Sequence, residues 1–267
     1  LAMNNGCDTY QYETGAYTIE EVRRTGACNW TVPSGVSAVD LLVVGGGGGG
    51  GAHVAGGGGA GGVYQKTNFA VSAGEVIPVE VGAGGAGAQW SPRLYGENGG
   101  QSKFGTFAVL GGGRGASWNW SNANGTGASG TSVLATVANG GGGTWAGGPG
   151  GATASALGAG FSGGNAGGAG SIYNAEPHPA GGGGGAGGAG QAASGQFLAG
   201  KGGPGVATTI RGYTEYVGGG GGGGIHGWWD YTYGYMYSNG GAAVGGIGGG
   251  GAGSAGYNYW AFSRGGD

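Results

Sequence analysis

Over the first 110 residues, apolar and polar positions alternate in short runs, and this spacing of two predicts β-strands. Each run follows a turn signal and is built from Val, Leu, Ile, Phe or Tyr, which favour strands. No stretch repeats its apolar residues at the helical spacing of about 3.6, so we expect negligible α-helix. The predicted strands cover residues 17–23, 27–32, 36–44, 63–71, 76–81 and 102–110.

Consecutive glycines follow the strand that ends at Val44, and similar tracts recur along the rest of the chain. Beyond Leu110, aliphatic residues are too sparse to fill a conventional core. Glycine takes their place, interrupted mostly by single alanines, as in Gly185-Ala186-Gly187-Gly188-Ala189-Gly190. The tracts lie at 45–51, 140–143, 147–151, 158–170, 181–190, 200–205, 218–224 and 245–256.

This local three-residue rhythm is typical of polyglycine II, an extended left-handed helix with three residues per turn and a rise of about 3.1 Å per residue. The helix has no internal hydrogen bonds, so each N–H and C=O must find a partner in a neighbouring chain. Without Cβ atoms, the backbones can approach closely. We therefore expect parallel glycine helices that bond to one another and dock on the strands, with alanine marking the outward face.

Together these patterns predict an all-β fold, in which a jelly-roll-like sandwich carries a polyglycine-II bundle as one unit. Residues 1–110 would form the sandwich with the first glycine tracts inserted, and residues 111–267 the bundle with its loops. The polar residues 1–16 are expected to be an extended lead. A disulfide between Cys7 and Cys28 would hold this lead, with a stabilisation of roughly 3 kcal/mol from loop closure. Two free thiols are the alternative.

Composition opposes the disorder that glycine content alone would suggest. Glycine supplies 83 of the 267 residues, yet 8% of residues are charged and 10% are aromatic. Disordered chains are rich in charge and poor in aromatic residues. The net charge is −3 and the basic residues are scattered, so no basic stripe follows a nucleic-acid backbone. No run of about 18 apolar residues predicts a membrane span.

Aromatic residues concentrate in the loops between glycine tracts, where there is almost no aliphatic core to join. Residues 225–262 hold 10 of the 28 aromatic side chains. A mixture of Tyr, Trp, Ser, Asn and Gly is typical of antibody-like binding loops. The candidate ligand-binding residues are Trp118, Trp120, Tyr173, His178, Trp228, Trp229, Tyr231, Tyr233, Tyr235, Tyr237, Tyr257, Tyr259 and Trp260.

Packing is the alternative use of these aromatic residues. They would then cap the open end of the glycine bundle, and the alternating tyrosines of 231–237 would form one face of a hairpin. The same aromatic residues can both bind a ligand and pack against the end of the bundle.

No catalytic, cofactor or metal site is predicted. The segment Gly160–Gly164 matches the nucleophile-elbow pattern around Ser162, but no helix is expected after it. The segment Gly195–Gly202 nearly matches a phosphate-binding loop, but glycine stands where Ser or Thr would bind Mg²⁺. The three histidines are isolated from one another. We therefore expect a non-enzymatic protein without a cofactor.

The segment Trp30–Gly51 resembles the opening of the glycine-rich domain of bacterial surface proteins and phage tail proteins. Matching motifs follow in order at Gly61–Tyr64, Val71–Glu75, Val79–Gly87 and Asn98–Gly105. The resemblance implies a jelly-roll-like sandwich carrying glycine helices, similar to the glycine-rich ectodomain of the anaplastic lymphoma kinase receptor. The layout also resembles the tip adhesins of T-even-type phage long tail fibres, which display receptor-binding loops on packed polyglycine helices.

The leading hypothesis is an extracellular adhesin or receptor-binding module, at a cell surface or on a virion tail, that binds a cell-surface glycan or protein. Self-association or a fibre or parent protein is a further candidate partner, whereas nucleic acid is not expected. Two other classes stay open. One is a structural subunit of an extracellular filament, sheath or matrix, and the other is an ice-binding protein that orders water on a face of alanines.

Overall fold

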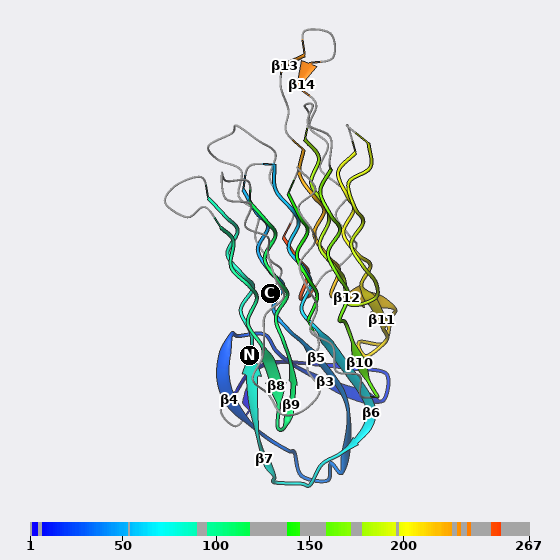
Figure 1. Cartoon of the computed structure of the whole chain (residues 1–267). Helices are drawn as coiled ribbons and strands as arrows, with labels where there is room; N and C mark the ends of the chain where they lie inside the picture. The colour runs from blue at the N-terminus through cyan, green and yellow to red at the C-terminus, as the bar shows by residue number, and fades with distance from the viewer. Residues whose placement is uncertain are drawn as a thin grey trace.

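The fold is elongated, with β-sheets at one end and bundled glycine tracts running away from them (Figure 1). Throughout the described residues the chain is strand, turn or extended segment, without α-helix, which confirms the all-β class. The computed structural model describes residues 2–4, 7–52, 54–89, 95–117, 138–144, 159–171, 178–195, 198–225, 229–230, 234–235 and 247–251.

Two antiparallel sheets enclose the main hydrophobic core. One sheet has the order β4 (Gly26–Thr31), β7 (Val76–Val81), β8 (Ser102–Phe104) and β9 (Phe107–Val109). The other has the order β10 (Phe161–Ser162), β6 (Val63–Ala70) and β5 (Ala38–Val44). The buried side chains of these sheets and of residues next to their strands form a single cluster, which the N-terminal Cys7 also joins. Its members are Cys7, Trp30, Val32, Val43, Tyr64, Val71, Ile77, Val79, Phe104 and Val109. The jelly-roll detail of this arrangement stays a prediction.

Aromatic rings join the two sheets across this core. Phe69 of β6 meets Phe104 and Phe107 of the other sheet edge-on, with ring centroids 5.8 and 5.4 Å apart. Such edge-to-face pairs add about 0.5–1.5 kcal/mol each beyond the area that they bury. The two sheets therefore form a rigid base for the rest of the chain.

The first residues of the chain form a sheet of their own, where we expected an extended lead over residues 1–16 and a strand over residues 17–23. Its strands are β1 (Ala2–Asn4), β2 (Cys7–Thr14) and β3 (Tyr17–Val22). Gly15 has a φ of 58°, which favours glycine and permits the tight turn between β2 and β3. A disulfide joins Cys7 of β2 to Cys28 of β4, with 5.1 Å between the Cα atoms. This sheet is therefore tied covalently to the core.

Residues 102–110, expected to be one strand, form β8 and β9. The chain reverses at Gly105, whose φ is 58° and whose N–H donates to the Pro78 carbonyl (2.9 Å). The reversal places Phe104 opposite Phe107 in the register. The pair Gly105-Thr106 between Phe104 and Phe107 was the sequence signal for this turn, and the sequence analysis did not use it.

A short hairpin that the sequence pattern did not predict lies beside β6. Its strands are β11 (Val206–Thr208) and β12 (Glu215–Val217). Gln65 of β6 donates from Nε2 to the Ala207 carbonyl (3.2 Å). Strands of three residues are too short for an alternating pattern to identify.

The glycine tracts have the three-residue period of polyglycine II. Along the tract 56–62, successive N–H groups point to three different neighbours in turn, and every third residue returns to the same one. Within each set, the residue number of the acceptor changes by three from one donor to the next. Gly56, Gly59 and Gly62 donate to Ala116, Gly113 and Leu110 in turn. Gly57 and Ala60 donate to Gly181 and Gly184, and Gly58 and Gly61 donate to Gly251 and Gly248.

The direction of these steps corrects one expectation. Along 56–62, the residue numbers of the acceptors rise in the tract 181–184, so this tract is parallel to 56–62. They fall in the tracts 110–116 and 248–251, so these two are antiparallel to it. The bundle therefore mixes both directions instead of being parallel. A helix of three residues per turn can bond to either kind of neighbour, because its N–H groups point outward around the whole axis.

Six of the described tracts are hydrogen-bonded to 56–62. Besides the three acceptors, three tracts donate to its carbonyls, through Gly48 to Gly59 (2.8 Å), Gly142 to Gly57 (2.7 Å) and Gly221 to Gly58 (2.9 Å). These tracts come from both sides of residue 110, and the division into two domains at that position stays a prediction. The bundle is held together by backbone hydrogen bonds where a conventional core would use apolar side chains.

Glycine is required because the tracts leave no room for Cβ atoms. A Cβ built on Gly47 would lie well under 3.0 Å from the Gly249 carbonyl oxygen, and one on Gly48 equally close to that of Gly113. The obstructing atoms belong to backbone, so they cannot rotate away as a side chain would. The same obstruction by backbone recurs along the tract 56–62.

Alanine marks the outward face at only some positions, which corrects a second expectation. Ala189 and Ala192 are exposed, but Ala60 and Ala186 are buried. The Ala186 methyl group belongs to a small apolar cluster with Val63 and Val217, where the glycine tracts meet the sheets. This cluster joins the bundle to its base.

Two asparagines link tracts next to the sheets. Asn139, fully buried, donates its side-chain amide to the carbonyls of Ala60 (3.1 Å) and Gly61 (3.3 Å). Its side-chain oxygen accepts from the N–H of Asn165 (3.1 Å), and Asn165 in turn donates to the Gly185 carbonyl (2.7 Å). A side-chain amide has the donors and acceptor of a peptide group, so it extends the backbone network sideways.

Replacing Gly48 with Val is expected to lower the free energy of unfolding by more than about 3 kcal/mol, because the added side chain meets immobile backbone. Ala189→Val is the matched control, since Ala189 lies in a tract but is exposed, and its effect should stay within about 0.5 kcal/mol. Chemical denaturation measures both. Equal stability of the two variants would show that the tract tolerates side chains as a flexible linker does.

Replacing Asn139 with Ala is expected to cost about 2–4 kcal/mol, because it leaves buried backbone groups in two tracts without partners. Asn98→Ala is the control. The Asn98 side chain accepts one exposed hydrogen bond, from the Arg114 N–H (2.9 Å), and its loss should cost less than about 1 kcal/mol. Urea titration measures both, and a similar small loss for both would refute the linking role of Asn139.

Candidate functional site

The candidate site is the end of the glycine bundle that lies away from the sheets, called here the distal end. Hydrogen bonds gather at this end residues that are far apart in sequence. Ser117 Oγ accepts from the Ala52 N–H (3.0 Å), and the Gly224 N–H donates to the Ala55 carbonyl (2.8 Å). The Ala180 N–H donates to the Gly224 carbonyl (2.9 Å). The bundle therefore brings the bases of several predicted loops to one place.

Three aromatic segments begin directly at this end. The segment with Trp118 and Trp120 follows Ser117, and the segment with Tyr173 follows Ser171. The segment with Trp228 follows the described residue Ile225. Ser171 belongs to the same end, because its N–H donates to the Pro179 carbonyl (3.0 Å), next to Ala180.

A layer of buried side chains lies at the distal end beneath these loop bases. Val54, Ser117 and Thr144 are each 1% exposed and Ile225 is 2% exposed. Thr144 and Ile225 each directly follow an uninterrupted glycine tract, and Ser117 follows Gly115 and Ala116, so all three share a position at the end of glycine-rich sequence. The sequence analysis did not identify this layer, although that shared position was a usable signal.

Val54 of this layer has an unusual backbone conformation. Its φ is 51°, in the left-handed region that β-branched residues avoid, and it is buried. Such a conformation costs on the order of 1–3 kcal/mol and persists only where the surroundings enforce it. Here the tracts 45–51 and 56–62 enforce it, because the Gly51 N–H donates to the Gly56 carbonyl (3.1 Å) just beneath the turn.

Two of the predicted binding residues form a cross-strand pair. The strands β13 (Trp229–Asp230) and β14 (Gly234–Tyr235) pair antiparallel, with Trp229 opposite Tyr235. This hairpin lies beyond the distal end and is the element farthest from the sheets (Figure 1). Of the alternating tyrosines that were expected on one face of a hairpin, Tyr235 lies on a described strand, and Tyr231, Tyr233 and Tyr237 lie outside the described residues.

The remaining predicted residues divide into two groups. His178 is half-buried at the start of the tract that continues through Pro179 and Ala180. The others lie outside the described residues: Trp118, Trp120, Tyr173, Trp228, Tyr231, Tyr233, Tyr237, Tyr257, Tyr259 and Trp260.

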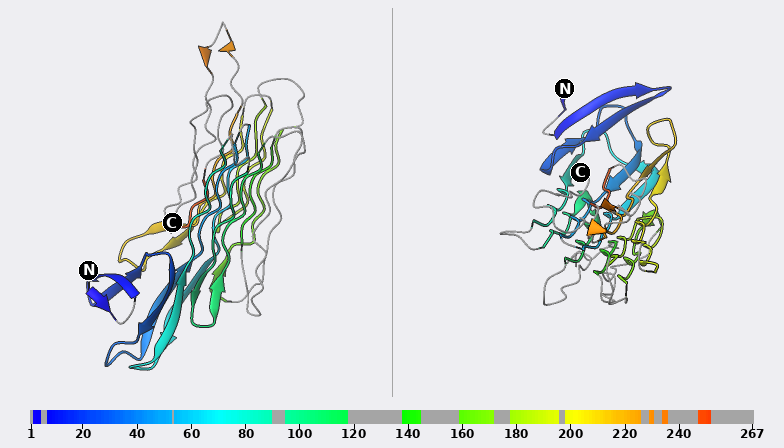
Figure 2. Two further views of the ribbon diagram at one scale, coloured as in Figure 1. Left: turned by 90° about the vertical axis from the view of Figure 1, so that its left-hand side faces the viewer. Right: turned by 90° about the horizontal axis from the view of Figure 1, so that it is seen from above.

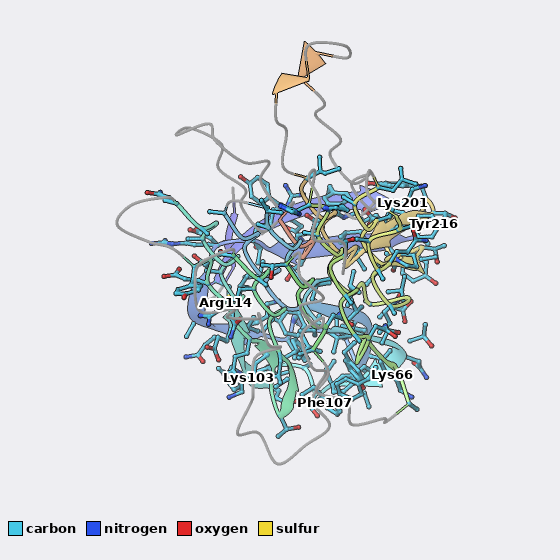
Figure 3. The ribbon with its side chains drawn as sticks, turned by 45° about the horizontal axis from the view of Figure 1, so that its top comes forward. Lys66, Lys103, Phe107, Arg114, Lys201 and Tyr216 are labelled. Carbon is cyan, nitrogen blue, oxygen red and sulfur yellow. A yellow bond between two sulfur atoms is a disulfide. The ribbon has the colours of Figure 1, made fainter. Side chains whose placement is uncertain are left out.

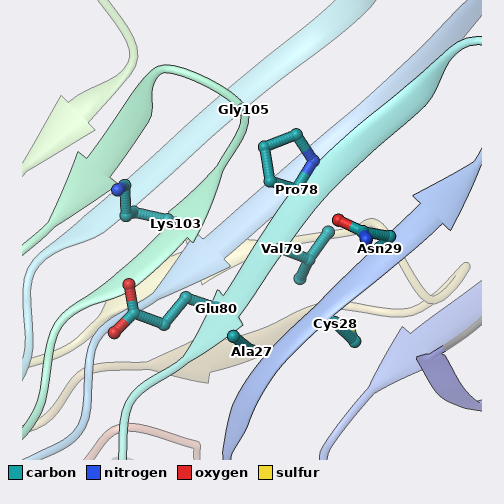
Figure 4. A pocket seen from close by; sticks show the side chains of 8 residues that line it. All are labelled: Ala27, Cys28, Asn29, Pro78, Val79, Glu80, Lys103 and Gly105. Carbon is teal, nitrogen blue, oxygen red and sulfur yellow. The ribbon is translucent and has the colours of Figure 1, made fainter.

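A hollow of about 290 Å³ on the outer face of the sheet β4-β7-β8 is a second place where a ligand could bind (Figure 4). Asn29, Glu80 and Lys103 supply its polar groups, and Gln101 Nε2 donates to Glu80 Oε2 (3.1 Å). Its floor holds small apolar side chains and no aromatic ring. The lining residues are Ala27, Cys28, Asn29, Pro78, Val79, Glu80, Lys103 and Gly105.

The N-terminal sheet lies next to the hairpin β11-β12 (Figure 2, left). A polar cluster joins this sheet to the turn between β11 and β12. Arg211 Nε contacts Glu21 Oε1 (2.6 Å), and Arg211 Nη1 contacts Glu215 Oε2 (3.0 Å). Tyr12 donates its hydroxyl to Glu21 Oε1 (2.5 Å). The charged groups pair with one another, so we interpret the cluster as a clasp between elements that lie far apart in sequence.

The pKa values in the clasp follow from its burial and its bonds. Burial, reinforced by the hydrogen bond to Glu21, raises the pKa of Tyr12 to about 12. Burial also pushes the pKa of Glu21 upward, but hydrogen bonds from Tyr12 and Arg23 and the charge of Arg211 outweigh it. The net pKa of Glu21 is therefore lowered.

The weak catalytic motifs lie in unsuitable surroundings. Ser162 belongs to β10 and pairs with Val63, with glycines and not a helix after it. Lys201, at the end of the near phosphate-loop match, is exposed on a glycine tract. Within the described part of the chain, no group of three or more His, Cys, Asp or Glu side chains is arranged to hold a metal ion.

Four of the described basic side chains lie far from one another, whereas Arg23 and Arg211 both pair with Glu21. Lys66, Lys103, Arg114 and Lys201 belong to separate elements and lie apart around the molecule (Figure 3). None of the described segments is a helix long and apolar enough to cross a membrane.

Comparison with known proteins identifies one family. A family model described as a glycine-rich domain matches residues 22–267. No curated protein matches the chain.

Replacing Glu21 with Gln is expected to destabilise the protein by about 1–3 kcal/mol at pH 7, because it removes the negative charge that pairs with Arg211 and replaces one of the two acceptor oxygens by an NH₂ donor. Since the folded-state pKa of Glu21 is lowered, its contribution is present above the ordinary Glu value of about 4.3 and is lost as pH falls through the folded value. The difference in melting temperature from wild type should therefore narrow towards pH 3.

Glu13→Gln is the control for the clasp, because Glu13 is an exposed carboxylate on the neighbouring strand. Its melting temperature should stay near that of wild type at both pH values. A loss from Glu21→Gln that is equal at pH 7 and pH 3 would contradict an ionised Glu21 as the centre of the clasp.

Proposed function

The chain belongs to the glycine-rich domain family, and on this basis we propose that it is a non-enzymatic extracellular recognition module. Its glycine bundle would carry aromatic loops at the distal end to a glycan or protein on a cell surface. The observation that supports this most strongly is the gathering of loop bases from distant parts of the sequence at one end of the bundle.

The scaffold suits recognition because it is rigid where the loops begin. Each tract at the distal end is fixed by backbone hydrogen bonds to its neighbours, and the layer around Val54 is buried. A binding surface whose base is already ordered loses less conformational entropy on binding, which favours affinity. Val54 is held in a left-handed conformation that costs free energy. Backbone strain of this kind is concentrated at functional sites, which supports a functional role for the loop base.

The composition of the loops supports a glycan or a protein as the ligand. Tyr and Trp provide large amphipathic contact areas at low entropic cost, and Asn, Ser and Gly provide adaptable hydrogen bonds. The hairpin with Trp229 and Tyr235 reaches farthest from the sheets, so it would meet a ligand first. Tyr and Trp are also the residues most often found at the energetic centres of protein interfaces.

The disulfide between Cys7 and Cys28 supports an extracellular setting, because disulfides persist in oxidising compartments. Both a cell surface and a virion tail fit this proposal. The resemblance to polyglycine-helix adhesins of T-even-type phages favours a tail-fibre role, and the resemblance to the ectodomain of a receptor kinase favours a cell-surface one.

Replacing Trp229 and Tyr235 together with Ala should weaken binding to intact cells or to an immobilised glycan array at least 10-fold. The melting temperature should change by less than about 2 °C, because the hairpin lies beyond the bundle. Tyr216→Ala is the matched control, since Tyr216 is 52% exposed on β12, close to the sheets.

Undiminished binding by the double variant would refute recognition through this hairpin. Light scattering on the same samples tests the alternative of a filament subunit. Concentration-dependent polymers that disappear in the double variant would assign these aromatic residues to contacts between subunits instead.

A further inference from the structure

Exposed tyrosines gather where the N-terminal sheet meets the hairpin β11-β12. Among the described residues, the exposed large apolar side chains are those of Tyr10, Tyr17, Val76, Leu198, Tyr213 and Tyr216. Four of these six are tyrosines, two on the N-terminal sheet and two in the hairpin. Both elements lie near the sheets, away from the distal end (Figure 2, left). Exposed aromatic side chains that gather in one place are typical of an interaction surface.

Three tyrosines share one face of the N-terminal sheet. In its register, Tyr10 lies opposite Glu21 and Tyr17 lies opposite Thr14. Alternate residues of a strand point to the same side of a sheet, and so do two residues directly opposite each other. Tyr10, Tyr12 and Tyr17 therefore form a row on one face.

This face points away from the hydrophobic core. The opposite face of the N-terminal sheet carries Cys7, whose disulfide joins it to the core, and Glu20, which accepts a hydrogen bond from Trp30 Nε1 (2.5 Å). In agreement, Tyr10 is 48% exposed and Tyr17 is 68% exposed. The row of tyrosines is therefore on the outer side of the sheet.

The clasp holds a fourth tyrosine at the same face. Glu21 of this face contacts Arg211 of the turn between β11 and β12, and Tyr213 lies next to the Arg211 side chain. Gly212 has a φ of 84° and approaches Thr14 so closely that a Cβ would collide with the Thr14 hydroxyl group. The turn therefore rests on the face, with Tyr213 58% exposed. We call Tyr10, Tyr12, Tyr17 and Tyr213 the tyrosine face.

Charged groups hold rings of the tyrosine face in place. The Arg23 guanidinium lies 4.8 Å from the centroid of the Tyr10 ring, and Tyr12 donates its hydroxyl to Glu21 (2.5 Å). Arg23 in turn donates from Nε to Glu21 (2.6 Å). Rings that are already ordered lose less conformational entropy when a ligand binds, which favours affinity.

The charges around the tyrosine face balance. Each carboxylate contacts a guanidinium group: Glu21 contacts Arg211 and Arg23, Glu215 contacts Arg211, and Asp8 contacts Arg24. Three negative groups thus meet three positive groups. A charged partner would have to break these pairs or leave its own charge without a counterpart. The electrostatic complement of this surface is therefore an uncharged partner.

We propose that the tyrosine face binds an uncharged linear polysaccharide. The C–H bonds of a sugar ring carry small positive charges and pack against the negative face of an aromatic ring. The tyrosine hydroxyls and the paired carboxylate and guanidinium groups can donate to and accept from the hydroxyl groups of a sugar. The tyrosine face thus offers both kinds of contact that a neutral sugar can make.

The length of the row favours a chain over a single sugar. Thr14, opposite Tyr17, is four residues along the strand from Tyr10, which corresponds to about 14 Å at a rise of about 3.4 Å per residue. This length exceeds that of one sugar ring. A sheet face accepts an extended chain along its strands, whereas a single small ligand is usually bound in a concave pocket.

This site goes beyond the recognition proposed for the distal loops. The hairpin with Trp229 and Tyr235 lies at the opposite end of the molecule from the N-terminal sheet (Figure 1; Figure 2, left). The two sites share no residue, so either can fail a test without affecting the other.

Calorimetric titration with cellohexaose, xylohexaose, mannohexaose and chitohexaose tests the proposal. At least one of these uncharged chains should bind. Its affinity should change by less than about 2-fold between low salt and about 0.5 M NaCl, because salt screens only charged partners. Absence of binding by all four would overturn the proposal, and an affinity that falls steeply with salt would contradict an uncharged ligand.

Replacing Tyr10 and Tyr17 together with Thr should weaken binding of that hexasaccharide at least 10-fold. Threonine also favours strands, so the melting temperature should change by less than about 4 °C. Phe at the same two positions keeps the rings and should leave the affinity within about 3-fold of wild type. Tyr216→Ala is the matched control, since Tyr216 is exposed on the face of the hairpin opposite to Glu215 and should leave binding unchanged.

Three results would refute the assignment. Equal affinity of the threonine variant and wild type would show that these rings do not bind the sugar. Concentration-dependent dimers in sedimentation, lost in the threonine variant, would show that a second copy of the chain occupies the face. Loss of hexasaccharide binding on replacing Trp229 and Tyr235 with Ala would assign it to the distal loops instead.

Discussion

Backbone hydrogen bonding between chains that lack Cβ atoms is the interaction on which this structure depends. Around the tract 56–62, all the directions perpendicular to the helix axis are taken by N–H···O=C bonds to other tracts. The bonds need an approach so close that a methyl group would collide with a carbonyl oxygen. Glycine is therefore not a source of flexibility here, because it permits neighbouring extended chains to pair their backbone groups without forming a sheet.

This kind of order is cooperative and needs a fixed base. Fixing one residue costs about 1–2 kcal/mol in backbone entropy, and one hydrogen bond contributes a net 0.5–1.5 kcal/mol. For a single glycine helix, the two free energies nearly cancel. In a bundle anchored to a folded core, each ordered tract bonds to several neighbours, so ordering one tract helps to order the others. The sheets supply the anchor through the cluster of Val63, Ala186 and Val217 and through the asparagine bridge at Asn139.

The same lattice explains why function would concentrate at the ends and sides of the bundle. Interior positions accept only glycine or, at a few places, alanine, so side-chain chemistry is pushed to where tracts begin, end or face solvent. The distal end gathers loop bases from distant parts of the chain.

Residue spacing by itself determined the all-β class, most strands of the two sheets and the three-residue helices. Alternating apolar positions identify strands such as β6 and β7. A tract without side chains has few ordered conformations besides the three-residue helix. The aromatic density of the loops was equally visible in the sequence. Two of the residues selected on that basis, Trp229 and Tyr235, pair in a hairpin. The burial of Ala60, the reversal at Gly105 and the layer around Val54 were not predicted.

Only the tertiary structure decided which tract lies beside which, and whether each pair is parallel or antiparallel. One glycine tract presents the same repeated backbone as any other, so its sequence holds no information about its neighbours. The pairing of tracts depends on the position in the sheets at which each tract leaves its strand. It also depends on single side chains such as Asn139 and Ala186.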